Sequence, residues 1–530
     1  MKILVTDPIA RAGLDILRQH AGVDERPGIG ADELEAIIPG YEALIVRSQT
    51  RVTAPVIEAG SRLRVIGRAG VGVDNIDVEA ATRRGILVVN SPEGNIVSTA
   101  EHTIAMMLAL ARRILPAHIR LHSGVWDRSL KGVEIRNKTL GIIGLGRVGV
   151  EVVEMARGLR MNVIAYDPMV AGSRADQLGV DLVEMEGLLS ESDFVTVHVP
   201  LNSTTRNMIG REQLGMMKPS AMIINCARGG IIDEVALYEA LEEGVLMGAA
   251  VDVFSEEPAC DNILLKSERV ITTPHLAASA VEAEASASTD IAEQVADILE
   301  GQLARSPVNA PVISSEAMAV LGPYLQVGIT IGRIAVQLVE GLLKSITIRY
   351  QGDIAGEDTN PIKVAVLTGL LESLTEEKVN IVNADIIARG RGLRVSEEKD
   401  TTCENYANML TVELETRDGS TVVAGSSLRG RTHLVRVNDY WLEIEPTGYY
   451  MLFTEHEDRP GMIGAMGTIV GDADVNISQM QVSRGIRRGG EAMMVLCLDD
   501  PVPEECYRRI LAIPHMYRAL IVKLSPGGPA

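Results

Sequence analysis

The sequence predicts an α/β fold in which two doubly wound parallel-sheet domains are followed by an α+β region and a small ferredoxin-like unit. Short apolar strands alternate with helical segments as far as His275, which predicts parallel sheets covered by helices. A glycine-rich turn joins one of these strands to its helix, which is typical of a nucleotide-binding sheet. After Gly448 the predicted order changes to β-α-β-β-α-β, the order of a ferredoxin-like unit.

The first doubly wound domain begins at Lys2 and extends to about Ser91. Its predicted strands read KILVTD, ALIVRS, LRVIGR and ILVVNS, with helices between them such as residues 11–20. It has no glycine fingerprint of its own, so we do not expect it to bind the nucleotide. Residues 99–122 then predict one long connecting helix, with Ser98 and Thr99 as candidate caps.

The second domain contains the glycine-rich turn, in the stretch NKTLGIIGLGRVGVEVVEMARGLRMNVIAYD. Gly144 suits the tight turn, Gly146 lets the backbone approach a pyrophosphate, and Gly149 lets helix pack on strand. Asp167 follows Gly149 by 18 residues, close to the roughly 20 expected for a carboxylate that binds a ribose diol. Glycines in this pattern can also be turn punctuation alone. The flanking strand, helix and acid favour an NAD site, because the carboxylate would repel the 2′-phosphate of NADP.

Charged side chains and one histidine follow the predicted strands, and the carboxyl ends of parallel strands form the ligand edge of such sheets. His275 suits an acid–base role, because the ordinary pKa of a histidine, about 6.5, lies near working pH. Glu257 could orient this ring, and Arg228 could clamp a carboxylate through two hydrogen bonds. The set suits hydride transfer from a 2-hydroxy acid. The strand-end residues are Arg47, Arg68, Arg228, Asp252, Glu257 and His275.

Each of these assignments has a plainer alternative. His275 taken alone could equally be structural. Arg47 and Arg68 could be solvated surface cations, although their position at strand ends favours ligand contact. His198 lies within a predicted strand and is expected to be packed, and we assign His102 no role.

Composition and charge restrict the partners. Fifty basic and 71 acidic residues give a net charge of −21, so we expect neither nucleic acid nor membrane as a partner, and a phosphorylated ligand must be held by a local basic cluster. The N-terminus enters a strand without a leader, and we find no apolar run that approaches a membrane span. Five scattered cysteines predict no disulfide framework, no metal site and a reducing compartment, the cytoplasm: Cys226, Cys260, Cys403, Cys497 and Cys506.

A linker rich in Pro, Ser and Asn, SPVNAPVISSEA, separates the doubly wound part from the tail. Residues 317–445 then mix helices and strands, which predicts the α+β region. The last unit predicts the strands YYMLFTEH, VNISQMQVSR, EAMMVLCL and ALIVKL, helices at 462–470 and 504–513, a DRPG turn and a hairpin RGIRRGG.

Six motifs in the same order resemble the D-isomer-specific 2-hydroxyacid dehydrogenase family. They read AGVGVDNID, GLGRVG, VHVPL, NCARGGIIDE, DVFSEEP and TPHLAAS. The tail resembles that of the long members, in which an intervening domain precedes an ACT domain. The resemblance implies a discontinuous substrate-binding domain at 1–98 and 283–305, an NAD-binding Rossmann domain at 99–282, an intervening domain at 312–446 and an ACT regulatory domain at 448–530.

The resemblance also implies residue roles. Arg228 would be the substrate clamp, Glu257 the partner of the histidine, and His275 the acid–base group. Ala278 and Ala280 depart from the glycine and threonine that are usual in the family. The resemblance therefore does not define the contact that the loop makes at these two positions. Residues implied at the cofactor are Val71, Gly144, Gly146, Arg147, Val148, Gly149, Asp167, Val199, Pro200, Cys226, Ala227, Asp252, Leu276, Ala277 and Ala278. Residues implied at the substrate are Arg47, Arg68, Gly70, Asn95 and, from a neighbouring subunit, Arg128.

The tail is implied to be regulatory. His456, Asp458 and Asn476 would hold L-serine across a pair of ACT domains. The intervening domain would bind an anion. Arg389, Arg391 and Arg394 are candidates for that contact, although a solvated charged loop fits them equally well.

The resemblance therefore implies NAD-dependent oxidation of 3-phospho-D-glycerate to 3-phosphooxypyruvate, the first step of serine biosynthesis, by a homotetramer. Two alternatives stay open. One is a dehydrogenase of another 2-hydroxy acid such as glycerate or lactate, against which the long tail argues. The other is an NAD-sensing scaffold of the corepressor kind, which keeps the motifs but works by binding partners.

Overall fold

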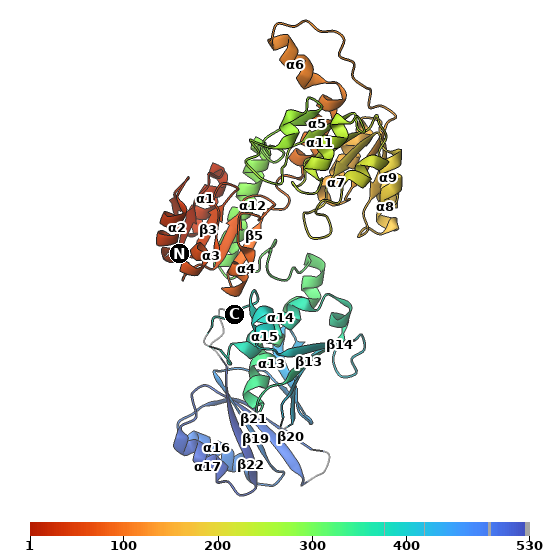
Figure 1. Ribbon diagram of the computed structural model, residues 1–530. Helices are drawn as coiled ribbons and strands as arrows, with labels where there is room; N and C mark the ends of the chain where they lie inside the picture. Colours follow the sequence, from red (N-terminus) through yellow and green to blue (C-terminus); the bar gives the residue numbers. More distant parts are fainter. Residues whose placement is uncertain (376, 418, 486–488, 525–530) are drawn as a thin grey trace.

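The computed structural model describes residues 1–375, 377–417, 419–485 and 489–524, and the elements given below are those of these residues. Four sheets follow one another along the chain. The first two lie in the upper half of Figure 1, and the two sheets of the tail lie below them. The predicted α/β class, with an α+β tail, is confirmed.

The first sheet is parallel, with strand order β2-β1-β3-β4-β5. Helices cover both of its faces, so its inner strands are buried on each side and read as continuous apolar runs. Helix α12 (Val281–Leu299) returns to this sheet and packs beside α1 on one face. Strand β2 was not predicted, because its sequence GVDE lacks an apolar run. The elements are β1 (Lys2–Val5), α1 (Arg11–His20), β2 (Gly22–Glu25), α2 (Ala31–Ile37), η1 (Ile38–Gly40), β3 (Ala43–Val46), α3 (Ala54–Ala59), β4 (Val65–Arg68), α4 (Val78–Arg83) and β5 (Leu87–Asn90).

The prediction of one connecting helix over residues 99–122 was wrong. The chain forms α5 (Ile96–Ala111) and α6 (Ile114–His122), and Arg113 between them is left-handed, with φ 53°. Half of α5 is buried under the second sheet, whereas α6 has no buried residue in this chain. The apolar periodicity therefore continues into a helix that leaves the core, which the pattern alone could not reveal. Asn95, rather than Ser98 or Thr99, is the N-cap of α5.

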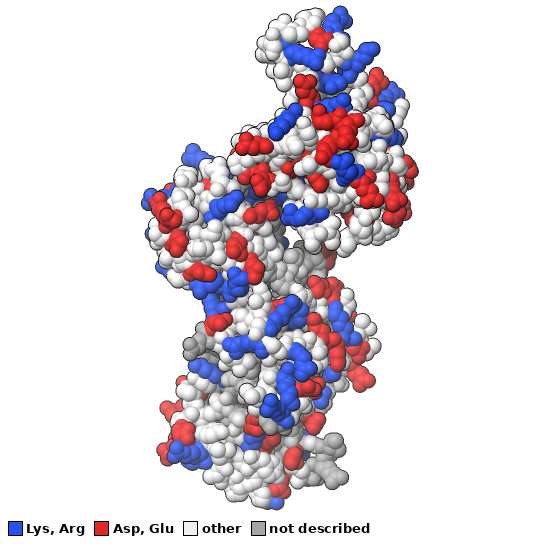
Figure 2. Space-filling view, viewed as in Figure 1, with Lys and Arg blue, Asp and Glu red and all other residues white. Residues whose placement is uncertain are grey.

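The second sheet is also parallel, with strand order β12-β11-β10-β9-β6-β7-β8. The order reverses between β6 and β9, and ligands of such sheets bind at that switch point. Acidic side chains are frequent over this domain in Figure 2, so a local basic cluster is needed to hold an anion. The elements are β6 (Thr139–Ile143), α7 (Arg147–Gly158), β7 (Asn162–Tyr166), α8 (Gly172–Leu178), β8 (Asp181–Leu182), α9 (Met185–Glu191), β9 (Phe194–Val197), α10 (Arg211–Met216), β10 (Met222–Asn225), α11 (Glu234–Glu242), β11 (Gly248–Val251), η2 (Ile263–Lys266) and β12 (Val270–Thr272).

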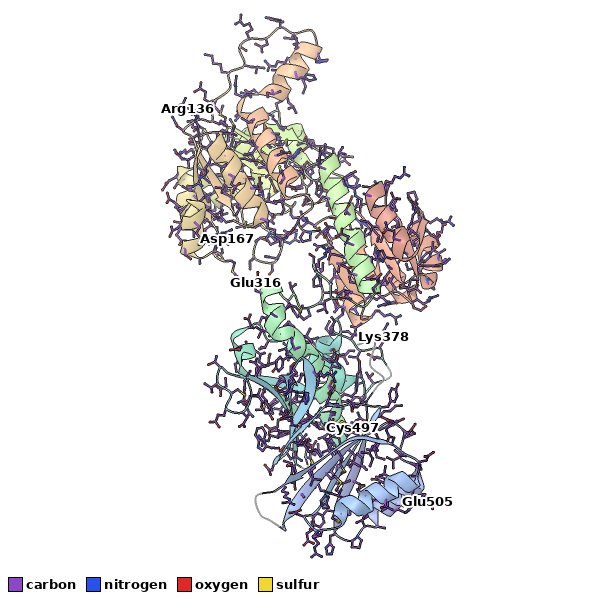
Figure 3. The ribbon with its side chains drawn as sticks, turned by 180° about the vertical axis from the view of Figure 1, so that it is seen from behind. Arg136, Asp167, Glu316, Lys378, Cys497 and Glu505 are labelled. Atoms are coloured by element: carbon purple, nitrogen blue, oxygen red, sulfur yellow. The ribbon has the colours of Figure 1, made fainter. Side chains whose placement is uncertain are left out.

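The third sheet is mixed, with strand order β14-β13-β15-β16-β17-β18. The loop after its helix α14 joins it to the first domain: Asn380 Nδ2 donates to the Gly85 carbonyl at 2.7 Å, and Val382 is buried in the core of the first domain. Lys378 lies at the same joint (Figure 3). The elements are α13 (Ser315–Leu338), β13 (Ser345–Gly352), η3 (Asp353–Gly356), α14 (Asn360–Leu371), α15 (Ala384–Gly390), β14 (Arg394–Asp400), β15 (Asn408–Glu415), β16 (Ser420–Leu428), β17 (Arg431–Val437) and β18 (Tyr440–Ile444).

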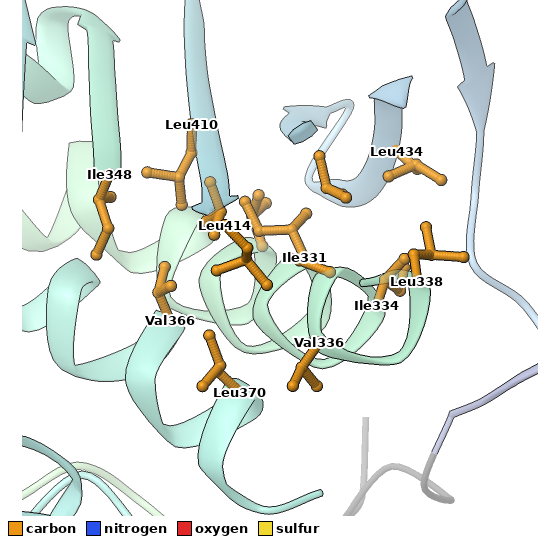
Figure 4. Close-up of a cluster of buried hydrophobic side chains, with 14 of the residues drawn as sticks. Ile331, Ile334, Val336, Leu338, Ile348, Val366, Leu370, Leu410, Leu414 and Leu434 are labelled. Carbon is orange, nitrogen blue, oxygen red and sulfur yellow. The ribbon is translucent and has the colours of Figure 1, made fainter. Parts of the chain in front are cut away.

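Helix α13 is long and apolar enough, over residues 316–338, to cross a membrane by length and composition, which the sequence analysis did not expect. Here it is the central helix of a core. Figure 4 shows Ile331 of α13 among Leu414 of β15 and Val366 of α14, and all three are fully buried. Packing against a sheet on one side and a helix on the other explains why the helix is apolar around much of its surface.

The last sheet has strand order β20-β21-β19-β22, and its elements follow the predicted β-α-β-β-α-β order. Its residues Met451, Phe453 and Val495 belong to the same buried cluster as α13, so the last two sheets share one core. Cys497 lies in that cluster, between the two sheets in Figure 3. The predicted hairpin RGIRRGG includes residues 486–488, which lie outside the described residues. The elements are β19 (Tyr450–Glu457), α16 (Met462–Asp472), β20 (Ile477–Arg484), β21 (Glu491–Leu498), α17 (Glu504–Leu511) and β22 (Met516–Lys523).

Candidate active site

The turn between β6 and α7 has the shape of a pyrophosphate site. A Cβ atom on Gly149 would lie 2.1 Å from the Gly144 carbonyl oxygen, so only glycine lets α7 pack against the turn. A Cβ on Gly146 would meet no described heavy atom within 4 Å, so this backbone faces open space. The first N–H groups of α7, at Arg147 and Val148, then point toward that space, as at other anion-binding helix N-termini.

Asp167 follows β7 and lies beside the same turn. Its carboxylate accepts the Leu145 N–H at 2.8 Å and the Met169 N–H at 2.9 Å, which orients it and leaves lone pairs for a ribose diol. The loop after β9 borders the turn as well, because Val199 Cγ1 would lie 2.9 Å from a Cβ on Gly144. These residues fit NAD. The contacts predicted for Val71, Pro200 and the other cofactor residues stay predictions.

A cavity of about 660 Å³ lies between the first and second domains. Both domains contribute to its walls, and four of the six predicted strand-end residues meet there. Its walls include Arg47, Arg68, Gly70 and Asn95 from the first domain and Glu257, His275 and Ala278 from the second. Arg228 stands beside this group: its Nε lies 3.6 Å from Asp74 Oδ2, and its Nη1 donates to the Ala227 carbonyl at 2.8 Å.

His275 and Glu257 form the predicted pair. His275 Nδ1 lies 2.8 Å from Glu257 Oε2, and Glu257 Oε1 accepts the Phe254 N–H at 3.0 Å. The hydrogen bond to Glu257 raises the pKa of His275, against the opposing effect of burial. Burial alone would raise the pKa of Glu257, but the hydrogen bonds from His275 and Phe254 hold it below its ordinary value. Glu257 therefore stays ionised and stabilises the imidazolium, while Nε2 of the ring is left for a ligand.

The loop that carries His275 is held in an unusual conformation. His275 has φ 56°, a left-handed value that is uncommon for a residue other than glycine. The buried carboxylate of Asp252 accepts the N–H groups of Leu276 at 2.7 Å and Ala277 at 2.9 Å, and the Thr273 hydroxyl at 2.6 Å. In this structure Asp252 thus holds the catalytic loop. The prediction that it also meets the nicotinamide stays a prediction.

Burial also fixes the protonation states of two other residues of the second domain, Cys226 and His198. Burial, together with the charge of Asp252, raises the pKa of the Cys226 thiol to about 12, so this thiol stays protonated in the core of the second domain. Burial lowers the pKa of His198 to about 4, and its Nε2 lies 3.0 Å from Thr196 Oγ1. His198 is therefore a neutral, half-buried residue directly after β9 and not a catalytic one, which agrees with the expectation that it is packed.

Arg68 is the strongest indication of an anionic ligand. Burial lowers its pKa to about 10, the charges of Arg228 and Arg47 add to that effect, and the carboxylates of Asp74 and Asp7 offset part of it. Its Nε is buried and has no hydrogen-bond partner among the described residues. A cation that is desolvated, repelled by two others and incompletely paired is costly unless an anion completes its contacts.

Sequence reasoning missed three acidic residues that arrange these cations. Asp7 follows β1 and accepts the N–H groups of Arg47, Gln49 and Thr50, so it shapes the loop after β3. Glu284 of α12 pairs with Arg47 at 2.7 Å, and Asp74 pairs with Arg228. Asp7 could have been found, because it lies at the same strand-end edge as Arg47. Glu284 could not, since only the return of α12 brings it there.

Some predicted residues are not brought together within one chain. Arg128 is exposed on the segment after α6, which projects away from the cavity in Figure 1.

Strand β21 pairs Ala492 with His456 but Leu498 with Ile477, so His456 and Asn476 lie at opposite ends of β21, roughly 20 Å apart. Asp458 pairs with Arg484 at 3.2 Å, and Asn476 donates to Asp499 at 2.6 Å. Arg389 and Arg391 contact Asp385 and the Leu374 carbonyl, as a solvated loop would allow.

Comparisons with known proteins agree with this geometry. Residues 104–277 match the NAD binding domain of the D-isomer specific 2-hydroxyacid dehydrogenases, residues 320–438 the D-3-phosphoglycerate dehydrogenase intervening domain, and residues 450–515 the ACT domain. The chain is 46% identical to the D-3-phosphoglycerate dehydrogenase of Synechocystis sp., over 99% of this chain and 95% of that protein. It is 44% identical to the D-3-phosphoglycerate dehydrogenase of Methanocaldococcus jannaschii, over 99% and 100%.

Solved structures match the doubly wound part. The apo-structure of D-lactate dehydrogenase from Escherichia coli is 27% identical, with a TM-score of 0.53, and covers 58% of this chain and 100% of its own. The TT0316 protein from Thermus thermophilus is 32% identical, with a TM-score of 0.54 and the same coverage of each chain. The expected NAD-binding domain is thereby confirmed.

Proposed function

Because this chain belongs to the D-3-phosphoglycerate dehydrogenases of the D-isomer-specific 2-hydroxyacid dehydrogenase family, we propose that it oxidises 3-phospho-D-glycerate to 3-phosphooxypyruvate with NAD. This reaction is the first step of serine biosynthesis. The observation that supports this substrate is Arg68, which lines the cavity that also contains the His275–Glu257 pair and whose buried Nε has no hydrogen-bond partner among the described residues.

Each of three side chains has one task in the oxidation. The neutral imidazole of His275 accepts the proton of the 2-hydroxyl through Nε2, and Glu257 stabilises the imidazolium that results. Arg228 holds the carboxylate, so that C2 faces the second domain. The β6–α7 turn and Asp167 would hold NAD, which would supply the hydride acceptor for C2. Arg228 Nε lies 3.6 Å from Asp74 Oδ2, so the substrate carboxylate competes with Asp74 for this guanidinium.

Replacing Glu257 with glutamine should move the acid limb of the pH profile. The carboxylate raises the pKa of His275, and oxidation requires the neutral ring, so activity is lost as pH falls through that raised pKa. Without the carboxylate the pKa falls, and the acid limb of kcat/KM for oxidation should shift to lower pH, with a lower maximum. For the reverse reduction, which needs the imidazolium, the basic limb should shift to lower pH as well. An unchanged limb would contradict the role of Glu257.

The phosphate preference should depend on Arg68. Replacing Arg68 with methionine should lower kcat/KM for 3-phosphoglycerate about 10- to 100-fold, because charge-assisted hydrogen bonds to the phosphate are lost. The value for unphosphorylated D-glycerate should change far less. The matched control is Arg51→Met, an exposed arginine of the loop between β3 and α3 that is outside the cavity walls.

The same assay separates the alternatives. If wild-type protein shows no preference for the phosphorylated acid, its substrate is another 2-hydroxy acid. If no 2-hydroxy acid reduces NAD at all, a binding role of the corepressor kind is favoured instead.

The effector proposed for the ACT domain is L-serine. His456 supports it, since this side chain is buried and its Nε2 has no partner among the described residues. The opposite positions of His456 and Asn476 on β21 require a second ACT domain to complete the site. Replacing Asn476 with alanine should abolish inhibition by serine and preserve activity without it, whereas Arg508→Ala on the exposed face of α17 should keep the inhibition. Serine inhibition that survives Asn476→Ala would contradict this site.

We further propose a homotetramer, in which α6 and the segment after it contact a neighbouring subunit. Apolar side chains of this arm are exposed in the single chain: Ile119 by 62% and Trp126 by 79%. Exposed apolar clusters of this kind are typical of protein interfaces. Arg128 would reach the neighbouring cavity from the same arm. Light scattering that gave a single-chain mass would contradict the proposal.

A further inference from the structure

Histidine 102, to which the sequence analysis gave no role, lies directly behind the catalytic loop. It is on α5, and its Nε2 is 3.2 Å from Thr273 Oγ1 and 3.4 Å from Asp252 Oδ1. Thr273 is two residues before His275, and Asp252 is the carboxylate that holds the loop. The imidazole of His102 is therefore separated from the catalytic histidine by one hydroxyl and one carboxylate.

The hydrogen bonds of this group can run in only one direction. The Asp252 carboxylate is an acceptor, so the Thr273 hydroxyl donates its proton to Oδ1 at 2.6 Å. The Thr273 oxygen then has only lone pairs left, and the proton of the contact with His102 must be on Nε2. His102 therefore fixes the rotation of the Thr273 hydroxyl toward Asp252.

Asp252 needs that contact because it carries out several tasks at once. It is fully buried, and its two oxygens also accept the N–H groups of Leu276 and Ala277. These bonds hold the chain on the far side of His275, while the Asp252 carbonyl accepts the His275 N–H at 2.8 Å. A Thr273 hydroxyl that rotated away, for instance toward Met106 Sδ at 3.9 Å, would remove one of the bonds that fix this left-handed loop.

Helix α5 also connects this group to the substrate side of the cavity. Its N-cap, Asn95, lines the cavity, and His102 lies two turns further along the same helix. One rigid element thus contacts both the substrate wall and the support of the catalytic loop.

We propose that His102 is a positioning residue for the reaction: through Thr273 and Asp252 it holds the His275 loop in the conformation that pairs the ring with Glu257. This inference rests on the proposed function, in which His275 is the acid–base group. It assigns His102 an effect on kcat and not on the binding of NADH or substrate.

The test compares variants that differ only in the hydrogen bond. His102→Phe keeps the ring shape without a donor, and should lower kcat about five- to tenfold, the effect of one net hydrogen bond. KM for 3-phosphoglycerate, the Kd of NADH and the Tm should stay near the wild-type values. His102→Gln offers an amide N–H near the position of Nε2, and should restore kcat to within about threefold. Thr273→Val should resemble His102→Phe, and the double variant should be no slower than Thr273→Val alone, because the two act through one bond.

Three results would overturn the inference: an unchanged kcat in His102→Phe, a Gln variant as slow as the Phe variant, or additive losses in the double variant. A crystal structure of His102→Phe tests the loop without reference to the reaction. It should show the His275 Nδ1–Glu257 Oε2 contact lengthened from 2.8 Å or the loop rotated, and an unaltered pair would count against the inference. Failure of the proposed function is distinguishable, because it would appear as inactivity of the wild-type protein while this structural comparison kept its meaning.

Discussion

Replacing His275 with alanine should lower kcat for 3-phosphoglycerate oxidation by about 10²- to 10⁴-fold, the usual contribution of a general acid–base group. The variant removes the only histidine among the described wall residues of the cavity, and leaves Glu257 without its partner. NADH should still bind with nearly unchanged Kd, because its pyrophosphate and ribose sites are built by the β6–α7 turn and Asp167. Steady-state rates and NADH fluorescence titration measure the two effects separately.

The matched control for this variant is His433→Ala, in the intervening domain, which should keep the wild-type kcat. Added imidazole offers a second check, since a small base that fits the vacated space should restore part of the rate to the alanine variant. Turnover that survived in His275→Ala would place the base elsewhere and remove the basis of the mechanism.

The fold could be predicted wherever local pattern and tertiary packing agree. The buried strands of the two parallel sheets read as apolar runs, and the ferredoxin-like order was visible from turn chemistry. The pattern failed at Arg113, where the apolar period continues while the chain leaves the core. It failed again for α13, whose apolar surface reflects burial between a sheet and α14. In both places the partner of the apolar face decides the structure, and a local pattern does not name that partner.

The residues of the candidate site also divide into those that the local sequence pattern predicts and those that only tertiary packing brings together. His275, Glu257 and Arg68 could be predicted because each follows a strand, and parallel sheets gather strand ends at one edge. Asp74, Glu284 and His102 could not, because each reaches the cavity or its support from a helix or loop that packs there only in three dimensions. The residues that hold the chemistry in place were thus harder to find than the residues that perform it.

Replacing Arg228 with lysine should lower kcat/KM by about 10²- to 10³-fold, although the charge is kept. A guanidinium can donate two parallel hydrogen bonds to a carboxylate, each worth about 1.5–3 kcal/mol, and an ammonium cannot reproduce that geometry. Stopped-flow and steady-state rates at saturating NAD give the loss, which should fall on both kcat and KM because the carboxylate orients C2.

The matched control is Asp74→Asn, which removes the ion pair of Arg228 across the cleft without touching the guanidinium. Asp74 is largely exposed, with 83% of its side chain accessible, and exposed pairs contribute little, so kcat/KM should change less than about threefold. A large loss in Asp74→Asn would mean that closure of the cleft depends on the ion pair. A lysine variant with near-wild-type kcat/KM would mean that the carboxylate is held elsewhere, and Arg47 and Arg68 would be the cations to test, since they face the same cavity.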